Sequence, residues 1–368
     1  MTSLDKEIEQ HKKEIHSDSY PMSIGEAVSM YINGEMDIHP EFQRVYRWTL
    51  PQKSKFIESI LLGIPIPSFF VAQREDGVWD LVDGLQRFST ILSFMGELKN
   101  EDGEKLPPLA LTKGGYLSEL DGATWNDEEK ISKPLKLSFR REKIDFKIIK
   151  KESTSDTKYD LFRRLNTGGS ELSDQEVRNC LLLMTNREFY EWVIALSKNA
   201  DFIETTPLSD DKYSEQYNLE LLMRFIVFFT LDWSNVTSST IDDIGEFLND
   251  KIVALAKNTS FDTKIMNDTF SKSFQLINAA LGSDAFRKFY PSDNKHKGGF
   301  SIALFEAIST GIARNISSIS TTLDNSTLKK KIENFSVSPE FLSASGSGVR
   351  ANSRIPKTVP HAIDYFKQ

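Results

Sequence analysis

The stretch from residue 78 to residue 91 constrains the fold most, because it combines a buried strand, a tight corner and a helix in immediate succession. Val78–Val82 is apolar and β-branched enough for a strand, and Asp83-Gly84 ends it. Apolar side chains then recur at helical spacing over residues 85–98, which predicts a helix. Three polar residues therefore fall at the end of the strand and in the first turn of the helix: Asp83, Gln86 and Arg87.

This corner has the properties of an anion site. Backbone N–H groups and the positive end of the helix dipole point out of a helix N-terminus. Gly84 lets a ligand approach the backbone closely, and Arg87 offers a planar, charged fork for phosphate oxygens. A structural role fits the same residues, because Asp is a common N-cap and an Asp83–Arg87 ion pair would account for the arginine. The residues alone leave both interpretations open.

A second polar segment, residues 40–48, interleaves aromatic rings with Gln43, Arg44 and Arg47. A nucleotide or single-stranded nucleic acid site uses rings for stacking and arginines for phosphate. A loop whose rings fill the core and whose arginines are solvated explains the segment equally well.

A third segment, Asn166-Thr167-Gly168-Gly169, follows an amphipathic helix expected over residues 159–165. The backbone N–H groups of such a turn can form a small anion nest. Two glycines after a helix are also an ordinary C-cap, so the turn alone does not decide between the two. A capping box at residues 173–176 then predicts a helix over residues 177–184.

The remaining patterns predict a mixed α/β region followed by helices. Residues 135–140 and 144–149 alternate apolar and basic residues, which predicts paired strands with Lys136, Arg140 and Lys147 on one face. We interpret that face as solvated, with lysines protecting an edge, in preference to a basic binding strip. The expected fold class is α+β, with an α/β domain at residues 20–152 and an all-helical domain at residues 153–368. Helices in the second are expected over residues 188–196, 215–231, 240–256, 263–281, 300–314 and 327–335.

Composition excludes several classes of protein. The 368 residues carry a formal net charge of −8, which argues against a surface generally coated with nucleic acid but allows a local basic groove. The single cysteine, Cys180, rules out an intrachain disulfide framework. The longest apolar run, near residues 221–231, contains Arg224 and is too short to cross a bilayer. Residues 1–16 lack a signal-peptide core, so we expect a cytoplasmic protein. Walker A, nucleophile-elbow and zinc-protease motifs are absent from the sequence.

Three separated blocks together resemble the N-terminal domain family of GmrSD-type restriction endonucleases. They are Pro40-Glu41-Phe42-Gln43-Arg44 with Trp48, then Ile64-Pro65-Ile66-Pro67 followed by Val82–Ile91, and then Leu161–Gly169. Their order and spacing make the resemblance specific over residues 23–183. It implies a ParB/sulfiredoxin-like nucleotide-binding fold. It also implies a module that binds and hydrolyses nucleoside triphosphates in modification-dependent DNA restriction and phage defence.

The resemblance carries roles onto matching positions. The residues Asp83, Gly84, Gln86 and Arg87 match an Asp-Gly-Gln-Gln-Arg signature, in which Leu85 replaces the first Gln. The side-chain amide of that first Gln is therefore absent from this chain. The other matching positions are the Gln-Arg pair at Gln43 and Arg44 and the Asn-Thr-Gly turn at Asn166, Thr167 and Gly168.

In the mechanism that the resemblance implies, Arg87 and Arg44 clamp the phosphates, and Asp83 holds Mg²⁺ or positions the attacking water. Gln86 orients that water, and the turn at residues 166–169 closes over the phosphates. Relatives often carry a C-terminal HNH nuclease domain. Because this sequence shows no histidine cluster able to build one, the chain resembles the NTPase half alone, with DNA and a separate nuclease or defence protein as candidate partners.

Two other functions stay open. A non-catalytic adaptor would use the same site as a nucleotide switch while it binds DNA or a nuclease. A nuclease acting directly on DNA would need a cluster of carboxylates and histidines around a metal, and the sequence offers none at recognisable spacing.

Overall fold

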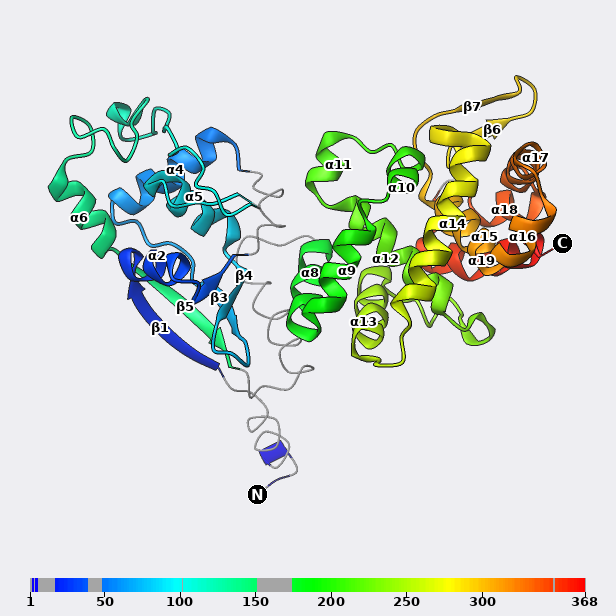
Figure 1. Cartoon of the computed structure of the whole chain (residues 1–368), viewed down its shortest axis with the longest axis horizontal. Coiled ribbons are helices and arrows are strands. Elements are labelled where there is room, and N and C mark those ends of the chain that lie inside the picture. Colours follow the sequence, from blue (N-terminus) through cyan, green and yellow to red (C-terminus); the bar gives the residue numbers. More distant parts are fainter. Residues whose placement is uncertain are drawn as a thin grey trace. The chain divides into compact units, whose positions relative to one another are not determined.

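A computed structural model describes most of the chain: residues 2, 4–5, 17–38, 48–100, 102–150, 174–346 and 348–367. The chain divides into two compact units, Met1–Glu171 and Leu172–Gln368 (Figure 1). The first unit is mixed α/β and the second is mainly helical, which agrees with the expected fold class at this level. The expected boundary at residues 152–153 lies outside the described residues and stays a prediction.

A five-stranded mixed sheet forms the centre of the first unit, in the order β1-β5-β3-β4-β2. The pairs β1–β5 and β3–β4 are antiparallel, whereas β3–β5 and β2–β4 are parallel. A hairpin turn joins β3 to β4, and the Gly77 N–H donates to the Arg74 carbonyl at 3.1 Å. The strands are β1 (Ser17–Ser23), β2 (Met36–Asp37), β3 (Phe69–Gln73), β4 (Trp79–Asp83) and β5 (Lys143–Ile149).

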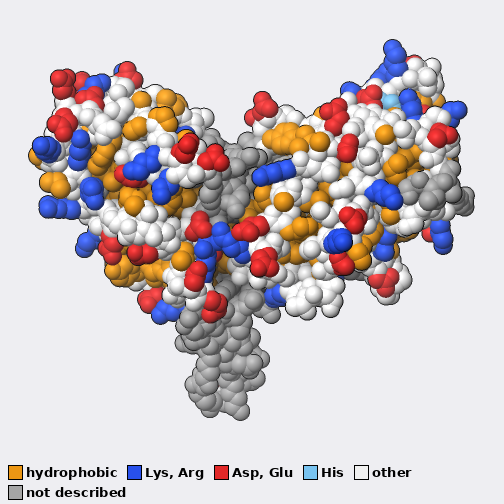
Figure 2. Space-filling view, in the orientation of Figure 1, with side chains coloured by type: hydrophobic (Ala, Val, Ile, Leu, Met, Phe, Trp, Pro, Cys, Tyr) orange, Lys and Arg blue, Asp and Glu red, His pale blue; other side chains and the backbone are white. Residues whose placement is uncertain are grey.

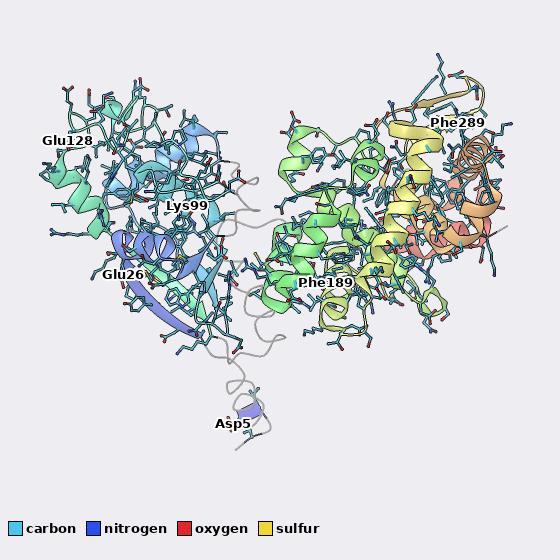
Figure 3. All side chains as sticks on the ribbon, in the orientation of Figure 1. Asp5, Glu26, Lys99, Glu128, Phe189 and Phe289 are labelled. Atoms are coloured by element: carbon cyan, nitrogen blue, oxygen red, sulfur yellow. The ribbon has the colours of Figure 1, made fainter. Side chains whose placement is uncertain are left out.

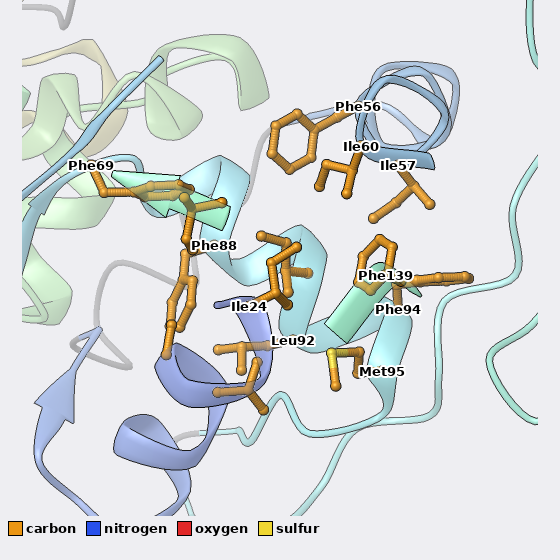
Figure 4. Close-up of a cluster of buried hydrophobic side chains, with 14 of the residues drawn as sticks. Ile24, Phe56, Ile57, Ile60, Phe69, Phe88, Leu92, Phe94, Met95 and Phe139 are labelled. Atoms are coloured by element: carbon orange, nitrogen blue, oxygen red, sulfur yellow. The ribbon is translucent and has the colours of Figure 1, made fainter. Parts of the chain in front are cut away.

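Helices supply most of the core that packs against this sheet (Figure 4). All residues of α5 from Arg87 to Met95 are buried. Phe88 of α5 meets Phe69 of β3 at 6.0 Å between ring centroids, and Phe69 stacks on Phe146 of β5 at 5.2 Å. The core therefore fixes α5 directly against the strands that lead into the corner. The helices of this unit are α2 (Ile24–Ile32), α4 (Leu50–Leu61), α5 (Leu85–Met95), η1 (Ser118–Leu120) and α6 (Lys133–Arg141).

The strand expected at residues 135–140 is wrong, because these residues form α6. Ser132 caps the helix by accepting the Leu135 N–H, and a proline occupies its first turn. Phe139 is buried between Phe94 and Trp125, each 5.5 Å away between ring centroids. Strand β5 pairs with β1 instead, and the three basic residues expected on one face are divided between helix α6 and strand β5.

A buried carboxylate fastens the loop at residues 112–117 to α4. Glu58 accepts backbone N–H bonds from Gly115 at 3.1 Å and from Tyr116 and Leu117 at 2.7 Å each. Burial alone would raise the pKa of Glu58, but these three donors, with Lys55, hold it below its ordinary value of 4.5. Glu58 therefore stabilises the fold in its ionised form.

We expect the Glu58→Gln variant to lose about 2 kcal/mol of unfolding free energy at pH 7, because hydrogen bonds to a charged acceptor are lost. Since the folded-state pKa lies below 4.5, the carboxylate contributes fully above that pH, and its contribution disappears as the pH falls through the folded-state pKa. Urea unfolding at pH 7 and at pH 3.5 measures this. The exposed Glu119→Gln is the control and should change stability by less than about 0.5 kcal/mol. A Glu58 effect that is the same at both pH values would contradict the assignment.

The second unit is mainly helical, and its described part contains one short antiparallel ribbon, β6 (Lys288–Tyr290) and β7 (Lys295–Lys297). The all-helical expectation is therefore wrong at these residues. A turn at residues 291–294, with Asn294 at φ +49°, reverses the chain there. The helices are α8 (Asp174–Thr185), α9 (Arg187–Leu196), α10 (Ala200–Thr205), α11 (Asp210–Ser214), α12 (Tyr217–Thr230), η2 (Trp233–Asn235), α13 (Ile244–Lys257), α14 (Thr263–Leu281), η3 (Gly282–Asp284), α15 (Ile302–Arg314), α16 (Ile316–Thr322), α17 (Asn325–Ser336), α18 (Pro339–Ala344) and α19 (Ala351–Phe366).

A buried ionic network joins three of these helices. Glu306 of α15, whose side chain is fully buried, bonds Arg224 of α12 and Arg354 of α19 at 2.7 Å each. Glu220 accepts from Arg224 at 2.6 Å, so the two arginines face two carboxylates. Burial, with the charge of Glu220, raises the pKa of the adjacent Tyr217 to about 12. No helix in the described part of the chain is both long and apolar enough to span a membrane.

Candidate functional site

The corner between β4 and α5 has the expected geometry. Strand β4 ends at Asp83, Gly84 follows at φ +101°, and α5 begins at Leu85. A Cβ atom at Gly84 would lie 2.4 Å from Cδ1 of Phe69, so only glycine fits. The requirement for glycine thus comes from packing inside the protein as well as from the backbone conformation.

Asp83 and Arg87 form the ion pair that the structural interpretation of the corner expects. Arg87 Nη2 lies 3.2 Å from Asp83 Oδ2 and also donates to the Ser68 carbonyl at 3.2 Å. Nη1 donates to the Pro67 carbonyl, and the guanidinium lies 4.7 Å from the centroid of the Phe69 ring. Residues 63–67 form a proline-containing connector between α4 and β3, and Arg87 fastens its end to the first turn of α5.

The charge of Arg87 is largely shielded from solvent, since the residue is only 7% exposed. Burial lowers the pKa of Arg87, and the charge of Asp83 opposes this effect. An arginine remains protonated at neutral pH in such a setting. Three of the five N–H donors of Arg87 bond Pro67, Ser68 and Asp83, and burial limits the access of a phosphate to the guanidinium.

Gln86 connects the corner to the segment that precedes α4. Its Oε1 accepts the backbone N–H of Trp48 at 3.1 Å, and the Trp48 indole packs edge-to-face on Phe56 of α4 at 5.3 Å. Asp83, Gly84, Gln86 and Arg87 are thus together, as expected from the sequence. The other predicted site residues lie outside the described part of the chain: Gln43, Arg44, Asn166, Thr167 and Gly168.

Asp83 fits the role of a single protein ligand to Mg²⁺. Mg²⁺ at nucleotide sites usually takes one or two carboxylates and completes its shell with phosphate oxygens and water. The Asp83 side chain is 19% exposed at the end of β4 and thus reaches solvent. The described residues contain no group of three or more His, Cys, Asp or Glu side chains arranged to hold a metal.

A second polar site in the first unit was not found from the sequence. Arg74 bridges Asp37 of β2 and Asp80 of β4 beside a pocket of about 250 Å³ whose wall also includes Tyr31 and Lys99. Burial would lower the pKa of Arg74, but hydrogen bonds to Asp80 and Asp37 raise it. In the sequence, the only signal of this site is that Arg74 precedes Asp80 by six residues across the turn between β3 and β4. That spacing gives no indication of Asp37.

A buried polar cluster in the second unit was also missed. Arg178 donates to Asn249 at 2.8 Å and to Gln175, which in turn donates to Asn179 at 2.7 Å. Asn179 then donates to Gln216, so α8 is bonded to α13 and to the start of α12. The signal was present in the sequence, because Gln175, Arg178 and Asn179 lie three and four residues apart on one face of a helix.

Comparison with known proteins gives one match. Residues 24–183 match the family model described as the N-terminal domain of the GmrSD restriction endonuclease. The matched range contains the corner and most of α8, and it confirms the resemblance based on the three sequence blocks. Neither the curated proteins nor the solved structures contain a significant match to the chain.

Proposed function

From the resemblance of residues 24–183 to the GmrSD restriction endonuclease N-terminal domain, we propose that this chain is a component of a modification-dependent DNA restriction system that acts in phage defence. Its activity in this proposal is to bind and hydrolyse a nucleoside triphosphate. The observation that carries the proposal is the corner itself, where a carboxylate, a glutamine amide and the N-terminus of α5 converge. Such a corner suits phosphate through the helix dipole and the backbone N–H groups of the first helical turn.

Each residue of the corner has a distinct role in the proposal. Asp83 holds Mg²⁺, which would neutralise phosphate charge, or positions the attacking water. Gln86 orients that water through its amide. Arg87 holds Asp83 and the 63–67 connector in place, and its charge adds to the positive potential at the phosphates. The hydrogen bond from Trp48 to Gln86 supports a shared site with Gln43 and Arg44, which come five and four residues before Trp48 in the sequence.

The first unit takes a ParB/sulfiredoxin-like fold in this proposal, with residues 166–168 closing over the phosphates. The mixed sheet that leads directly into a helix-opening corner supports this assignment. DNA and a separate nuclease or defence protein are the proposed partners, and the cytoplasm, where incoming DNA arrives, is the proposed location.

One alternative has an observation in its favour. Arg87 is already bonded to Asp83 and to two backbone carbonyls, and Leu85 replaces an amide of the family signature. A site with fewer groups available to stabilise transition-state charge would bind a nucleotide without hydrolysing it. The chain would then act as a nucleotide-switched adaptor for DNA or a nuclease.

Phosphate release from each of the four ribonucleoside triphosphates, with Mg²⁺ and with or without DNA, separates these functions. We expect many turnovers per protein molecule with at least one nucleotide, and stimulation by DNA. Nucleotide binding by calorimetry without turnover would establish the adaptor. Neither binding nor turnover would refute both.

A further inference from the structure

The second unit has a marked asymmetry of charge along its sequence. Residues 172–284 hold nine Lys and Arg against eighteen Asp and Glu, whereas residues 285–368 hold twelve against six. A local excess of cations in a chain with a net charge of −8 indicates an anionic partner more directly than the overall charge does.

Three of the twelve cations of the basic half lie among the six residues of the β6–β7 ribbon. Figure 2 shows Lys and Arg side chains gathered at the place where Figure 1 shows this ribbon projecting from the helices. In its antiparallel register Lys288 faces Lys297, and Tyr290 faces Lys295. Since side chains alternate along a strand, these four share one face, and all four are exposed.

The opposite face of the ribbon anchors it to the helices. Phe289 is buried there, at the position labelled in Figure 3, and its ring lies 5.1 Å from the ring of His296. His296 Nε2 lies 3.3 Å from Glu333 Oε1 of α17. The Lys329 Nζ lies 3.9 Å from the same oxygen, which places a fourth lysine at the rim of the ribbon.

The pairing of Lys288 with Lys297 is unfavourable for the ribbon alone, because like charges directly opposite each other destabilise a strand pair. Two contacts offset this cost in part. Both ammonium groups lie over the Tyr290 ring, at 5.3 and 5.4 Å from its centroid, and Lys297 pairs with Asp293. Lys295 and Lys288 still present their charges to solvent around an exposed aromatic ring.

We propose that this ribbon surface, formed by Lys288, Tyr290, Lys295, Lys297 and Lys329, binds the phosphate backbone of double-stranded DNA. A two-stranded antiparallel ribbon fits the major groove of B-DNA, and lysines on its outer face reach the flanking phosphates. The choice of DNA among polyanions rests on the proposed role in restriction. The surface and the proposed nucleotide corner belong to different units of the chain.

Fluorescence anisotropy with a labelled 20-base-pair duplex, at several salt concentrations, tests this surface on the full chain. The triple variant Lys288→Gln, Lys295→Gln, Lys297→Gln should bind at least about tenfold more weakly near 0.1 M salt. The slope of log affinity against log salt should fall by about 3, roughly one per lysine removed. The single variant Lys295→Glu should also lower both the affinity for DNA and the slope of its salt dependence.

The matched control removes three exposed lysines from the acidic half: Lys251→Gln, Lys264→Gln, Lys272→Gln. It should bind DNA as the native chain does. Equal losses in the two triple variants would overturn the proposal, because they would show only a general effect of net charge. Native affinity for DNA in the ribbon variant would also overturn the proposal. The same holds if the native protein binds vesicles containing phosphatidylglycerol but does not bind DNA.

Failure of this inference is distinguishable from failure of the nucleotide proposal. The ribbon variant should keep the DNA-independent rate of triphosphate hydrolysis, and a variant of Asp83 should keep its affinity for DNA. A ribbon variant that loses DNA-independent hydrolysis while its circular dichroism spectrum is unchanged would also contradict the assignment, since the surface would then not be a separate DNA contact.

Discussion

Replacing Asp83 with asparagine is expected to lower kcat for triphosphate hydrolysis by about 100- to 1,000-fold, the usual contribution of a residue that activates the attacking water. Asparagine keeps an oxygen that can accept from Arg87, so the corner retains its shape while the carboxylate charge is lost. The measurement is steady-state phosphate release with Mg²⁺, combined with calorimetric binding of the same nucleotide. Binding should weaken much less than turnover if the carboxylate acts mainly in the transition state.

Asp80→Asn is the matched control for this variant. Asp80 lies on the same strand, is buried and pairs with an arginine, Arg74, but it faces the other polar site. Its replacement should lower stability and leave kcat within about twofold of the native value. If the Asp83 variant turns over at the native rate, or if both variants lose kcat equally, the corner does not catalyse the hydrolysis.

Replacing Gly84 with alanine is expected to lower the free energy of unfolding by about 3 kcal/mol, from a strained backbone together with a forced contact. The backbone at Gly84 has φ +101°, and the added Cβ would lie 2.4 Å from the Phe69 ring and 3.3 Å from Arg87 Nη2. The midpoint of urea unfolding, followed by tryptophan fluorescence, measures the loss. Because Phe69 stacks on Phe146, the ring cannot move without disturbing the centre of the sheet.

The variant Gly77→Ala separates the two causes of the loss at Gly84, which are the strained backbone and the forced contact. Gly77 has φ +90°, close to that of Gly84, but a Cβ there would meet nothing within 4 Å. We expect it to cost about 1 kcal/mol, the strain of the backbone alone. Equal costs at the two positions would show that the close packing at Gly84 relaxes freely, contrary to its place in the core.

The sequence predicted those elements whose signals are local. The strand that leads into the corner, the corner itself and the start of α5 are set by residues within a few positions of one another, and all of them are present. The error at residues 135–140 has a physical cause. Leu135, Leu137 and Phe139 alternate as in a strand, but only the first and third turn inward, and Leu137 is 52% exposed. Leu135 and Phe139 are four residues apart, which places both on one face of a helix.

Strand β1 lies beyond the reach of such patterns. Its sequence contains a proline and three serines, and five of its seven residues are exposed. It becomes a strand because β5, about 125 residues later, offers an unpaired edge. This partner supplies backbone hydrogen bonds that no local propensity predicts.

The same distinction holds for the candidate site. The sequence predicted that Asp83, Gln86 and Arg87 meet at a corner, because a strand end and a helix start bring them together. It did not predict that Arg87 would bond the carbonyls of Pro67 and Ser68, or that Phe69 would leave no space for a side chain at Gly84. Those contacts come from packing between β3 and β4, where the register of the strand pair determines which residues lie next to the corner.

The pairing of β1 with β5 has a consequence for how the first unit can be assembled into larger proteins. Ser17 is the register partner of Ile149, so the chain enters and leaves this sheet at a single place on its edge. Sequences attached before residue 17 or after residue 150 can therefore emerge side by side without crossing the corner or the core. The geometry is that of a module that can be joined to other domains through one edge of its sheet.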